Sequence, residues 1–506
     1  MKIFKTEQVK EIDKYTIENE PIASIDLMER ASLTFVRWFM RTFDSSRKVV
    51  IFAGPGNNGG DGLAIARLLE KRFFNVEAYL LKLGSSFSED LSINKERLEK
   101  SGAKITVIES EEALPELSGD IIVVDAIFGS GLSRKAEGLP AAAIKLINSS
   151  KVEVVSVDIP SGLFGEDNSG NDPDVIIHAD YTISFQFPFL SFFFPENEQF
   201  CGECHAFSIG LHPEAIKKTS SDYNLVDQEF VMGMVGKRSK FAHKGTFGNA
   251  LYISGSDGMM GAAVLGIKAC LRTGAGLATA HVPGKTYSII QTAVPEALIS
   301  VDPSDFIFTD SPDLKAYSAI GAGPGLRTSP ETAKAMEKLL KNAEVPLVLD
   351  ADALNIISSN RDMLDMIPEA SILTPHPKEF DRLFGESENM YQRHHKQLEA
   401  AKKYRCYIVL KFAYTMTCDP EGNTWINKSG NPGMASGGSG DVLTGMILSF
   451  LAQGYDQKDA AVLGVYLHGL AGDLALERQS EESLIPGDII DYIGRAFKVI
   501  DPHTKN

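Results

Sequence analysis

Short apolar runs rich in Val and Ile alternate with helix-like stretches in the first half of the chain, and this alternation most limits the possible folds. Strands are expected at 48–53, 76–83, 105–108, 121–125 and 152–157, with helical stretches between several of them. Strands separated by helices pair in parallel, and the helices then cover both faces of the sheet. The pattern therefore predicts an α/β fold with a Rossmann-like, three-layer arrangement.

The same kind of pattern begins again in the second half. The chain has 506 residues, which is more than one hydrophobic core usually supports. Residues 212–245 mix Pro, Lys, Ser and Asp and are expected to be a connection. We therefore expect two domains, over residues 1–212 and 225–500. The second should contain strands at 249–254, 278–282, 316–320, 347–349, 371–373 and 406–410, and helices at 259–273, 440–452, 457–477 and 486–497.

Composition and charge exclude several classes of protein. The net charge of −17 implies no basic face for nucleic acid. No apolar run is long enough to cross a bilayer, and the N-terminal residues form no apolar signal core. Cys201 and Cys204 are the only close cysteine pair, and we expect them to be reduced thiols. A cytoplasmic enzyme with small-molecule partners, and without nucleic-acid or membrane partners, is expected.

Two glycine-rich loops, at 54–62 and 437–441, share one design. Each follows a strand region, opens a helix and carries an Asp beside its glycines. Backbone N–H groups at such a turn can surround a phosphate, and the helix N-terminus adds a partial positive charge. The loops lie in opposite halves of the chain, so they predict two separate nucleotide-handling sites.

Three polar loops of the first half should meet at one edge of its sheet, because parallel strands end on the same side. Asn58, Asp125 and Ser161 come from these loops and would offer oxygen ligands of the kind that alkali or alkaline-earth cations prefer. The alternative for each strand-end Asp is a helix or turn cap.

In the second half, Asp441 follows the loop Gly437-Gly-Ser-Gly440 and precedes an apolar helix. Such an Asp can take a proton from a substrate hydroxyl while the loop amides hold the attacked phosphate. The same division of labour is typical of ribokinase-like small-molecule kinases, and this half resembles that α/β/α fold. The alternative is that Asp441 only interacts with the helix dipole.

Longer motifs make the resemblance of the first half specific. The stretches at 56–62, 124–132 and 157–163 resemble the epimerase domain of the bacterial NAD(P)H-hydrate repair enzymes. The resemblance implies a potassium site at Asn58, Asp125 and Ser161, and Asp158 is our candidate acid/base residue. It also implies substrate contacts from Asn57, Asn58, Gly59, Gly60, Asp61, Gly129, Ser130, Gly131, Leu132, Ser133, Arg134, Lys135 and Asp158.

One position departs from this family. A Lys usually follows a strand there in a Phe-x-x-Pro-Lys pattern, whereas this chain has Phe189. A role of that Lys in phosphate binding or proton transfer has no counterpart here, and the aromatic run 182–195 is expected to be core or an oligomer contact.

Eight motifs in the second half occur in the order found in ADP- or ATP-dependent NAD(P)H-hydrate dehydratase domains, from 244–248 to 437–441. The resemblance implies dehydratase substrate contacts at Ala262, Gly325, His376, Pro377, Lys378, Glu379, Phe380, Asp381, Arg382 and Asp441. It implies nucleotide contacts at Lys411, Phe412, Ala413, Tyr414, Thr415, Asn431, Pro432, Gly433, Met434, Ala435, Ser436, Gly437, Gly438, Ser439 and Gly440.

Together these resemblances imply repair of hydrated NADH and NADPH. The first domain would interconvert the C6 epimers, and the second would dehydrate the substrate with ADP or ATP as phosphoryl donor and magnesium as cofactor. A homo-oligomer is expected. Two alternatives stay open: a ribokinase-like kinase that shares Asp441, and a nucleotide-sensing protein without turnover.

Overall fold

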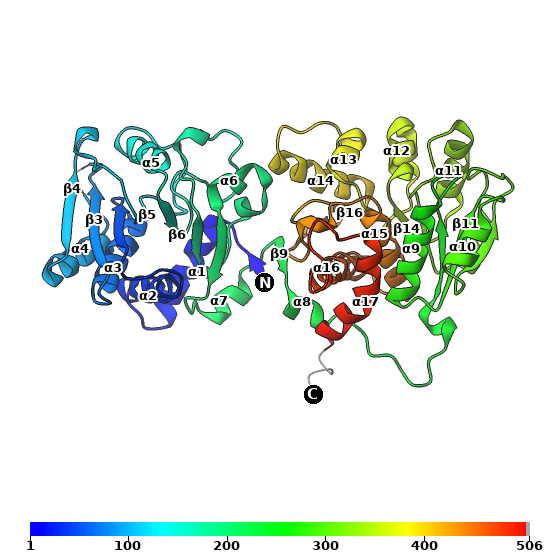
Figure 1. The fold of residues 1–506 in the computed structure, drawn as a ribbon, viewed down its shortest axis with the longest axis horizontal. Coiled ribbons are helices and arrows are strands. Elements are labelled where there is room, and N and C mark those ends of the chain that lie inside the picture. Colours follow the sequence, from blue (N-terminus) through cyan, green and yellow to red (C-terminus); the bar gives the residue numbers. More distant parts are fainter. Residues whose placement is uncertain (85, 502–506) are drawn as a thin grey trace. The chain divides into compact units, whose positions relative to one another are not determined.

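The computed structural model describes residues 1–84 and 86–501, and this part of the chain forms two compact units. The first is Lys2–Ser221, and the second begins at Asp222 (Figure 1). Each unit has its own sheet and its own buried core.

The N-terminal unit alternates strands and helices as its sequence predicts. Its elements are β1 (Lys2–Ile3), α1 (Thr6–Asn19), α2 (Ser24–Thr42), β2 (Lys48–Ala53), α3 (Asn57–Glu70), β3 (Asn75–Leu81), α4 (Glu89–Ser101), β4 (Lys104–Ile108), β5 (Ile121–Ala126), α5 (Leu139–Ser149), β6 (Glu153–Val157), β7 (Tyr181–Phe185), α6 (Glu198–Cys201), β8 (Glu203–Phe207) and α7 (Pro213–Lys218).

The sheet of this unit is parallel, with strand order β4-β3-β2-β5-β6-β7-β8. Strand β2 shows why helices cover both faces. Val49 and Ile51 pack with α2, α3 and α4, whereas Val50 and Phe52 pack with α5. The chain leaves β2 toward β3 on one side and returns to β5 on the other. The carboxyl ends of β2 and β5 therefore form the switch point at which ligands bind in such sheets.

The C-terminal unit repeats this design with more elements. They are β9 (Tyr223–Val226), α8 (Gln228–Met232), β10 (Asn249–Ile253), α9 (Met260–Thr273), β11 (Leu277–Val282), α10 (Tyr287–Ala293), β12 (Leu298–Val301), β13 (Ala319–Ala322), α11 (Pro330–Asn342), β14 (Leu347–Leu349), α12 (Asp352–Ser359), β15 (Ile372–Leu373), α13 (Pro377–Phe384), α14 (Met390–Tyr404), β16 (Tyr407–Leu410), β17 (Met416–Cys418), β18 (Thr424–Asn427), α15 (Ser439–Ala452), α16 (Gln457–Ala475) and α17 (Pro486–Ile500).

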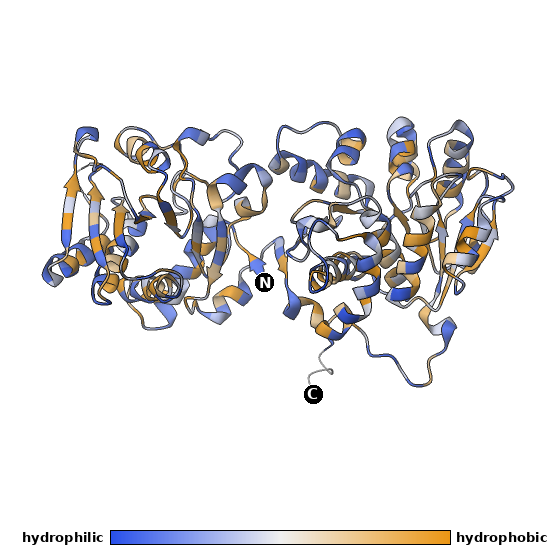
Figure 2. Cartoon of the chain, viewed as in Figure 1, coloured by the Kyte–Doolittle hydropathy of each residue, from blue (hydrophilic) through white to orange (hydrophobic). Residues whose placement is uncertain are grey.

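Its strands follow the order β9-β18-β17-β16-β15-β14-β13-β10-β11-β12. The strands from β16 to β12 run parallel, whereas β17 is antiparallel to both of its neighbours. Helices α9, α15, α16 and α17 pack on one face, and α11 to α14 lie on the other (Figure 1). Figure 2 shows the hydrophobic residues concentrated in the strands and in the inward faces of these helices.

Two sequence expectations need correction. Residues 212–245 are not a plain connection, because α7 belongs to the first unit and β9 pairs with β18 in the second. Strand β9 was missed because its four residues, Tyr223–Val226, are too short to show alternation. The strand expected at 316–320 begins instead at Ala319, since a short 3-10 turn covers Leu314–Ala316.

Candidate active sites

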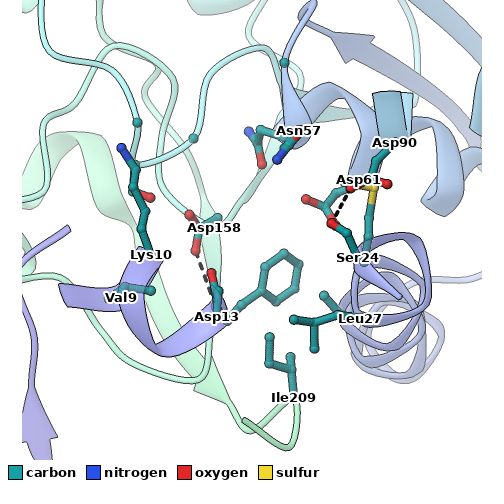
Figure 3. Close-up of a pocket in the computed structure, with 18 of the residues that line it drawn as sticks. Val9, Lys10, Asp13, Ser24, Leu27, Asn57, Asp61, Asp90, Asp158 and Ile209 are labelled. Carbon is teal, nitrogen blue, oxygen red and sulfur yellow. Dashed lines mark hydrogen bonds between the residues drawn. The ribbon is translucent and has the colours of Figure 1, made fainter. Parts of the chain in front are cut away.

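A pocket of about 790 Å³ lies in the N-terminal unit, at the carboxyl ends of β2, β5 and β6 (Figure 3). The loop after β2 contributes Asn57 and Asn58, the loop after β5 contributes 127–132, and the loop after β6 contributes Asp158. Helix α1 forms a further wall with Lys10 and Asp13. The switch point of the sheet is thus an open cavity whose mainly apolar walls carry several charged and amide side chains.

Three carboxyl groups in this pocket have raised pKa values. Burial, and then the charge of Asp158, raises the pKa of Asp13 to about 7. Burial raises the pKa of Asp158 to about 6, although N–H groups of Phe185 and Ser130 partly offset it. Burial, and then the charge of Asp158, holds the pKa of Asp61 well above its usual value. Carboxyls that titrate near neutral pH are suited to acid–base chemistry.

The backbone at Asp158 is also unusual. Its φ is +69°, a left-handed conformation that costs free energy in a residue with a side chain. Its backbone N–H donates to the carbonyl of Ile183, and Ser184 Oγ donates to its carbonyl at 2.5 Å. Strand β7 therefore holds Asp158 in a strained conformation that aims its side chain into the pocket (Figure 3).

Asp125 is fully buried beneath this pocket and is held by donated hydrogen bonds. Ser161 Oγ donates to Oδ1 at 2.5 Å, while Ser156 Oγ and Ser161 N donate to Oδ2 at 2.8 Å. No described cationic side chain pairs with Asp125, and burial raises its pKa. The nearby Asn58 is also buried, and its Nδ2 has no hydrogen-bond partner among the described residues.

The structure gathers most of the residues expected for the epimerase substrate. Asn57, Asn58, Asp61 and Asp158 line the pocket, as do the residues from Gly129 to Leu132. Gly59 and Gly60 do not line it. A Cβ on Gly59 would lie 1.9 Å from the carbonyl oxygen of Gly54, so this glycine allows the loop to fold tightly. Ser133, Arg134 and Lys135 are exposed to solvent and do not line the pocket.

Phe189, at the position of the family's Lys, does not line the pocket. It is 3% exposed and packs with Ile159, Leu163 and Phe192 in a small cluster. The aromatic run is therefore core around this residue, which was one of the two expected roles.

The C-terminal unit holds a second polar centre, at the carboxyl ends of β14 and β16. Asp350 follows β14 and is buried; its Oδ1 accepts from Lys411 Nζ at 2.7 Å and its Oδ2 from Thr444 Oγ1 at 2.7 Å. Asp441 stands in the first turn of α15. Burial, followed by the charge of Asp350, raises the pKa of Asp441 to about 7, whereas Lys411 lowers it.

The loop before Asp441 has the geometry that the sequence suggests for an anion site. Gly438 has a φ of +99° and is the N-cap of α15, so the first amides of this 14-residue helix have no partner within it. A Cβ on Gly440 would lie 3.3 Å from Lys411 Nζ and 3.6 Å from Asp350 Oδ2. The loop, Lys411 and Asp350 are therefore immediate neighbours.

Several other residues expected in the second site lie near this centre or close to one another. A Cβ on Gly325 would lie 3.3 Å from the Cβ of Ala262. Lys411 N donates to the carbonyl of Pro375 at 2.9 Å, which places β16 beside His376. Asn431 is held by Asp473, whose Oδ1 accepts from Nδ2 at 3.0 Å.

His376 caps helix α13. Its Nδ1 accepts from the N–H groups of Lys378 and Glu379 at 3.1 and 3.4 Å. Burial, and then the charge of Lys411, lowers its pKa, so the ring is neutral at neutral pH. Within the same segment, Phe380 is fully buried and Asp381 is paired with Arg393 at 2.8 Å. Those two side chains support the helix rather than face a substrate.

The sequence motifs missed residues at both sites. Asp13, Lys10 and Asp90 line the first pocket from α1 and α4, where the helical pattern gives no sign of a site. Asp350 and Thr444 complete the second centre. Asp350 directly follows the apolar strand β14, so its position was a usable signal, whereas Thr444 looks like any residue of an apolar helix.

Comparisons with known proteins match each of the two units to a protein family. A family model described as NAD(P)H-hydrate dehydratase matches residues 250–495, and one described as YjeF-related protein N-terminus matches residues 24–190. The bifunctional NAD(P)H-hydrate repair enzyme of Moorella thermoacetica is 35% identical over 516 residues, with 98% of this chain and 97% of that protein covered.

Solved structures resemble the C-terminal unit. A ribokinase-like superfamily protein from Enterococcus faecalis is 25% identical, with a TM-score of 0.50 and coverage of 56% of this chain and 98% of that one. The ADP/ATP-dependent NAD(P)H-hydrate dehydratase from Bacillus subtilis, co-crystallised with ATP/Mg2+, is 33% identical, with a TM-score of 0.49 and coverage of 54% and 98%.

The fold and the two sites define a two-domain α/β enzyme with a Rossmann-like N-terminal domain and a ribokinase-like C-terminal domain. The chain belongs to the family of bifunctional NAD(P)H-hydrate repair enzymes, which join an epimerase-type domain to a nucleotide-dependent dehydratase domain. Within residues 1–84 and 86–501, no helix is long and apolar enough to cross a membrane.

Proposed function

We propose that the chain restores hydrated NADH and NADPH in two steps. The domain over 1–212 interconverts the two epimers at C6, and the domain over 225–500 removes the hydroxyl group with ADP or ATP. The observation that carries this proposal is the presence of a titratable Asp at the strand ends of each unit, Asp158 in one and Asp441 in the other.

In the dehydratase step, Asp441 takes the proton of the C6 hydroxyl, and the oxygen attacks the terminal phosphoryl group of the nucleotide. The phosphate then leaves with the C6–O electron pair as the ring nitrogen lone pair forms a C=N bond. Loss of a proton from C5 restores the ring double bond. The raised pKa of Asp441 supports this role, because a base that titrates near 7 is poised at neutral pH.

The nucleotide would lie along the glycine-rich loop and the end of β16. The amides at Gly438–Gly440 would hold the transferred phosphoryl group, and Lys411 would neutralise its charge. Lys411 Nζ pairs with the buried Asp350 Oδ1 at 2.7 Å. The expected contacts at 412–415 and 431–436 belong to the same proposal.

Magnesium would enter this site with the nucleotide. Among the described residues, no group of three or more His, Cys, Asp or Glu side chains is arranged to hold a metal ion. Mg²⁺ commonly uses one or two carboxylates together with phosphate oxygens, and Asp350, beside the glycine-rich loop, would supply one. Bound magnesium would supply charge neutralisation on the phosphates.

Potassium would bind at the N-terminal site. Asp125 is a buried carboxylate without a described cationic partner, and Ser161 donates to it. The loop at 127–129 follows closely, because Phe128 N donates to Ser161 Oγ and Gly129 lies beside Asn58. The unpartnered amide of Asn58 fits a ligand position, because its nitrogen and oxygen exchange places by a simple rotation. The cation would fix these loops around the dinucleotide and offset the charge of Asp125.

The proposed dehydration is tested by measuring phosphate release together with the recovery of NADH. Full-length protein is mixed with hydrated NADH, magnesium and either ADP or ATP, and both released phosphate and dihydronicotinamide absorbance are recorded. The proposal expects equimolar phosphate and NADH. A phosphorylated product that accumulates without recovery of NADH would instead identify a kinase.

Two further expectations stay predictions. Assembly into a homo-oligomer is tested by sedimentation of the purified protein, and a cytoplasmic location by cell fractionation.

A further inference from the structure

The N-terminal pocket contains a carboxyl group that none of the recognised motifs includes. Asp13 lies on α1 and lines the pocket together with Asp158 from the loop after β6. Figure 3 shows the two side chains pointing toward one another, while Asp61 lies on the other side of the pocket near Ser24 and Asp90. Asp13 and Asp158 therefore form a facing pair at one wall of the cavity.

The electrostatics of this pair favour one shared proton. Burial raises the pKa of both groups, to about 7 for Asp13 and about 6 for Asp158, and the charge of Asp158 contributes to the shift at Asp13. Neighbouring carboxylates resist double ionisation, so such a pair loses its protons in two steps. Asp158 is the ionised member, because N–H groups at Phe185 and Ser130 stabilise its charge.

The surroundings of the pair are otherwise mixed in charge. The remaining charged groups that face this pocket are Lys10, Lys14 and Glu18 on α1, Asp61 on α3 and Asp90 on α4. Burial, followed by the charge of Asp158, raises the pKa of Asp61, and Ser24 Oγ donates to Asp90 at 2.6 Å. Both carboxyl groups lie on the other side of the pocket from the facing pair of Asp13 and Asp158 (Figure 3).

Two independent observations mark this pocket as the place where a ligand reacts. Asn58 lines this pocket and is 9% exposed, and its amide nitrogen has no partner within residues 1–84 and 86–501. Asp158 is held at a φ of +69°, a strain of the kind that clusters at functional sites.

We propose that Asp13 is a second catalytic residue of the epimerase site and acts with Asp158 as an acid–base pair on the hydrated nicotinamide ring. This inference rests on the epimerase function proposed above and names the groups that move its protons. The substrate carbon C6 carries a hydroxyl and is bonded to the ring nitrogen, so it is a hemiaminal.

The step balances without a further reactant. Asp158 takes the hydroxyl proton, the oxygen lone pair forms a C=O bond, and the C6–N bond breaks with its electron pair on nitrogen. Asp13 donates its proton to that nitrogen, which gives an open-chain aldehyde. Rotation about the C5–C6 bond presents the other face of the aldehyde. Closure then returns the proton from nitrogen to Asp13, and Asp158 returns the other proton to oxygen, which gives the second epimer.

The test uses the full chain, because its dehydratase domain reports on the epimerase domain. Each C6 epimer is isolated and supplied separately with ADP and magnesium, and recovery of dihydronicotinamide absorbance is followed. Recovery from the epimer that the dehydratase uses directly measures dehydration alone. Recovery from the other epimer, above its spontaneous exchange, measures epimerisation.

Asp13→Asn is expected to lower kcat for epimerisation by about 100-fold or more, with little change in KM, because general acid–base groups contribute about 10²–10⁴-fold. Dehydration should be unchanged. The wild-type epimerisation rate should peak between the two pKa values of the pair and fall at higher and lower pH. The matched control is Glu11→Gln, which removes an exposed carboxylate from the same helix and should epimerise at the wild-type rate.

A double variant keeps the result interpretable if either single change disturbs folding. Asp13→Asn, Asp158→Asn and their combination should lower the rate to a similar floor, since groups that act as a unit are non-additive, while thermal unfolding verifies that each variant is folded. A folded Asp13→Asn variant with a wild-type epimerisation rate would overturn this inference alone. A wild-type chain that does not accelerate epimer exchange would overturn the proposed epimerase function itself.

Discussion

Replacing Asp441 with Asn tests both the chemistry and the electrostatics of the dehydratase site. Burial and the charge of Asp350 raise the pKa of Asp441 from 3.8 to about 7 in the folded protein. A carboxyl with a raised folded-state pKa binds a proton more tightly in the native state, so stability falls as pH rises from about 4 to about 7. The shift of about three units corresponds to at most about 4 kcal/mol at neutral pH and above.

Asn has nearly the shape of a protonated Asp and cannot ionise, so Asp441→Asn should remove that loss. Without nucleotide, we expect the variant to unfold several degrees above the wild type at about pH 8, and at nearly the same temperature at about pH 4, where Asp441 is protonated. Turnover should be abolished while nucleotide binding is kept. Differential scanning calorimetry across pH, with calorimetric titration of ADP, measures these effects. Equal pH profiles of stability, or normal turnover, would refute the reasoning.

Three other changes test further parts of the sites. Lys411→Met should cost about 3 kcal/mol of stability, because it leaves the buried Asp350 without its cation, and should weaken ADP binding; unchanged urea denaturation would contradict this. Gly323→Ala should destabilise by more than about 1 kcal/mol, since its φ is +138° and a Cβ would lie 1.8 Å from a carbonyl oxygen, whereas the control Gly494→Ala meets no neighbour. Potassium should raise the unfolding temperature of the wild type above that in sodium, and Ser161→Ala should abolish the difference; an equal response of both proteins would exclude the proposed site.

The sequence predicted the fold class and most central strands because those strands are buried on both faces. The runs at 48–53 and 347–349 match β2 and β14 to the residue, since both are apolar apart from Lys48 and are bounded by polar or turn-forming residues. Edge and antiparallel strands such as β12 and β17 were missed, because they are short and their pairing depends on distant segments.

The site was predictable where chemistry follows a strand in the sequence. Asp158 was found in this way, because a polar residue after an apolar run stands at the edge of a parallel sheet. Asp441 was found instead from the glycine-rich loop that opens its helix. Asp13 could not be found, since it is one charged residue among many in helix α1 and only the tertiary fold brings it to the pocket. The raised pKa values also come from burial, which no single sequence displays.

The most direct test of the central claim is the recovery of NADH from an equal mixture of both C6 epimers. The full chain is supplied with the mixture, ADP, magnesium and potassium, and dihydronicotinamide absorbance is followed for a time that is short relative to spontaneous exchange. Two active domains predict complete recovery in one continuous phase. Recovery that stops at one epimer would contradict the epimerase function, and no recovery would contradict the repair function as a whole.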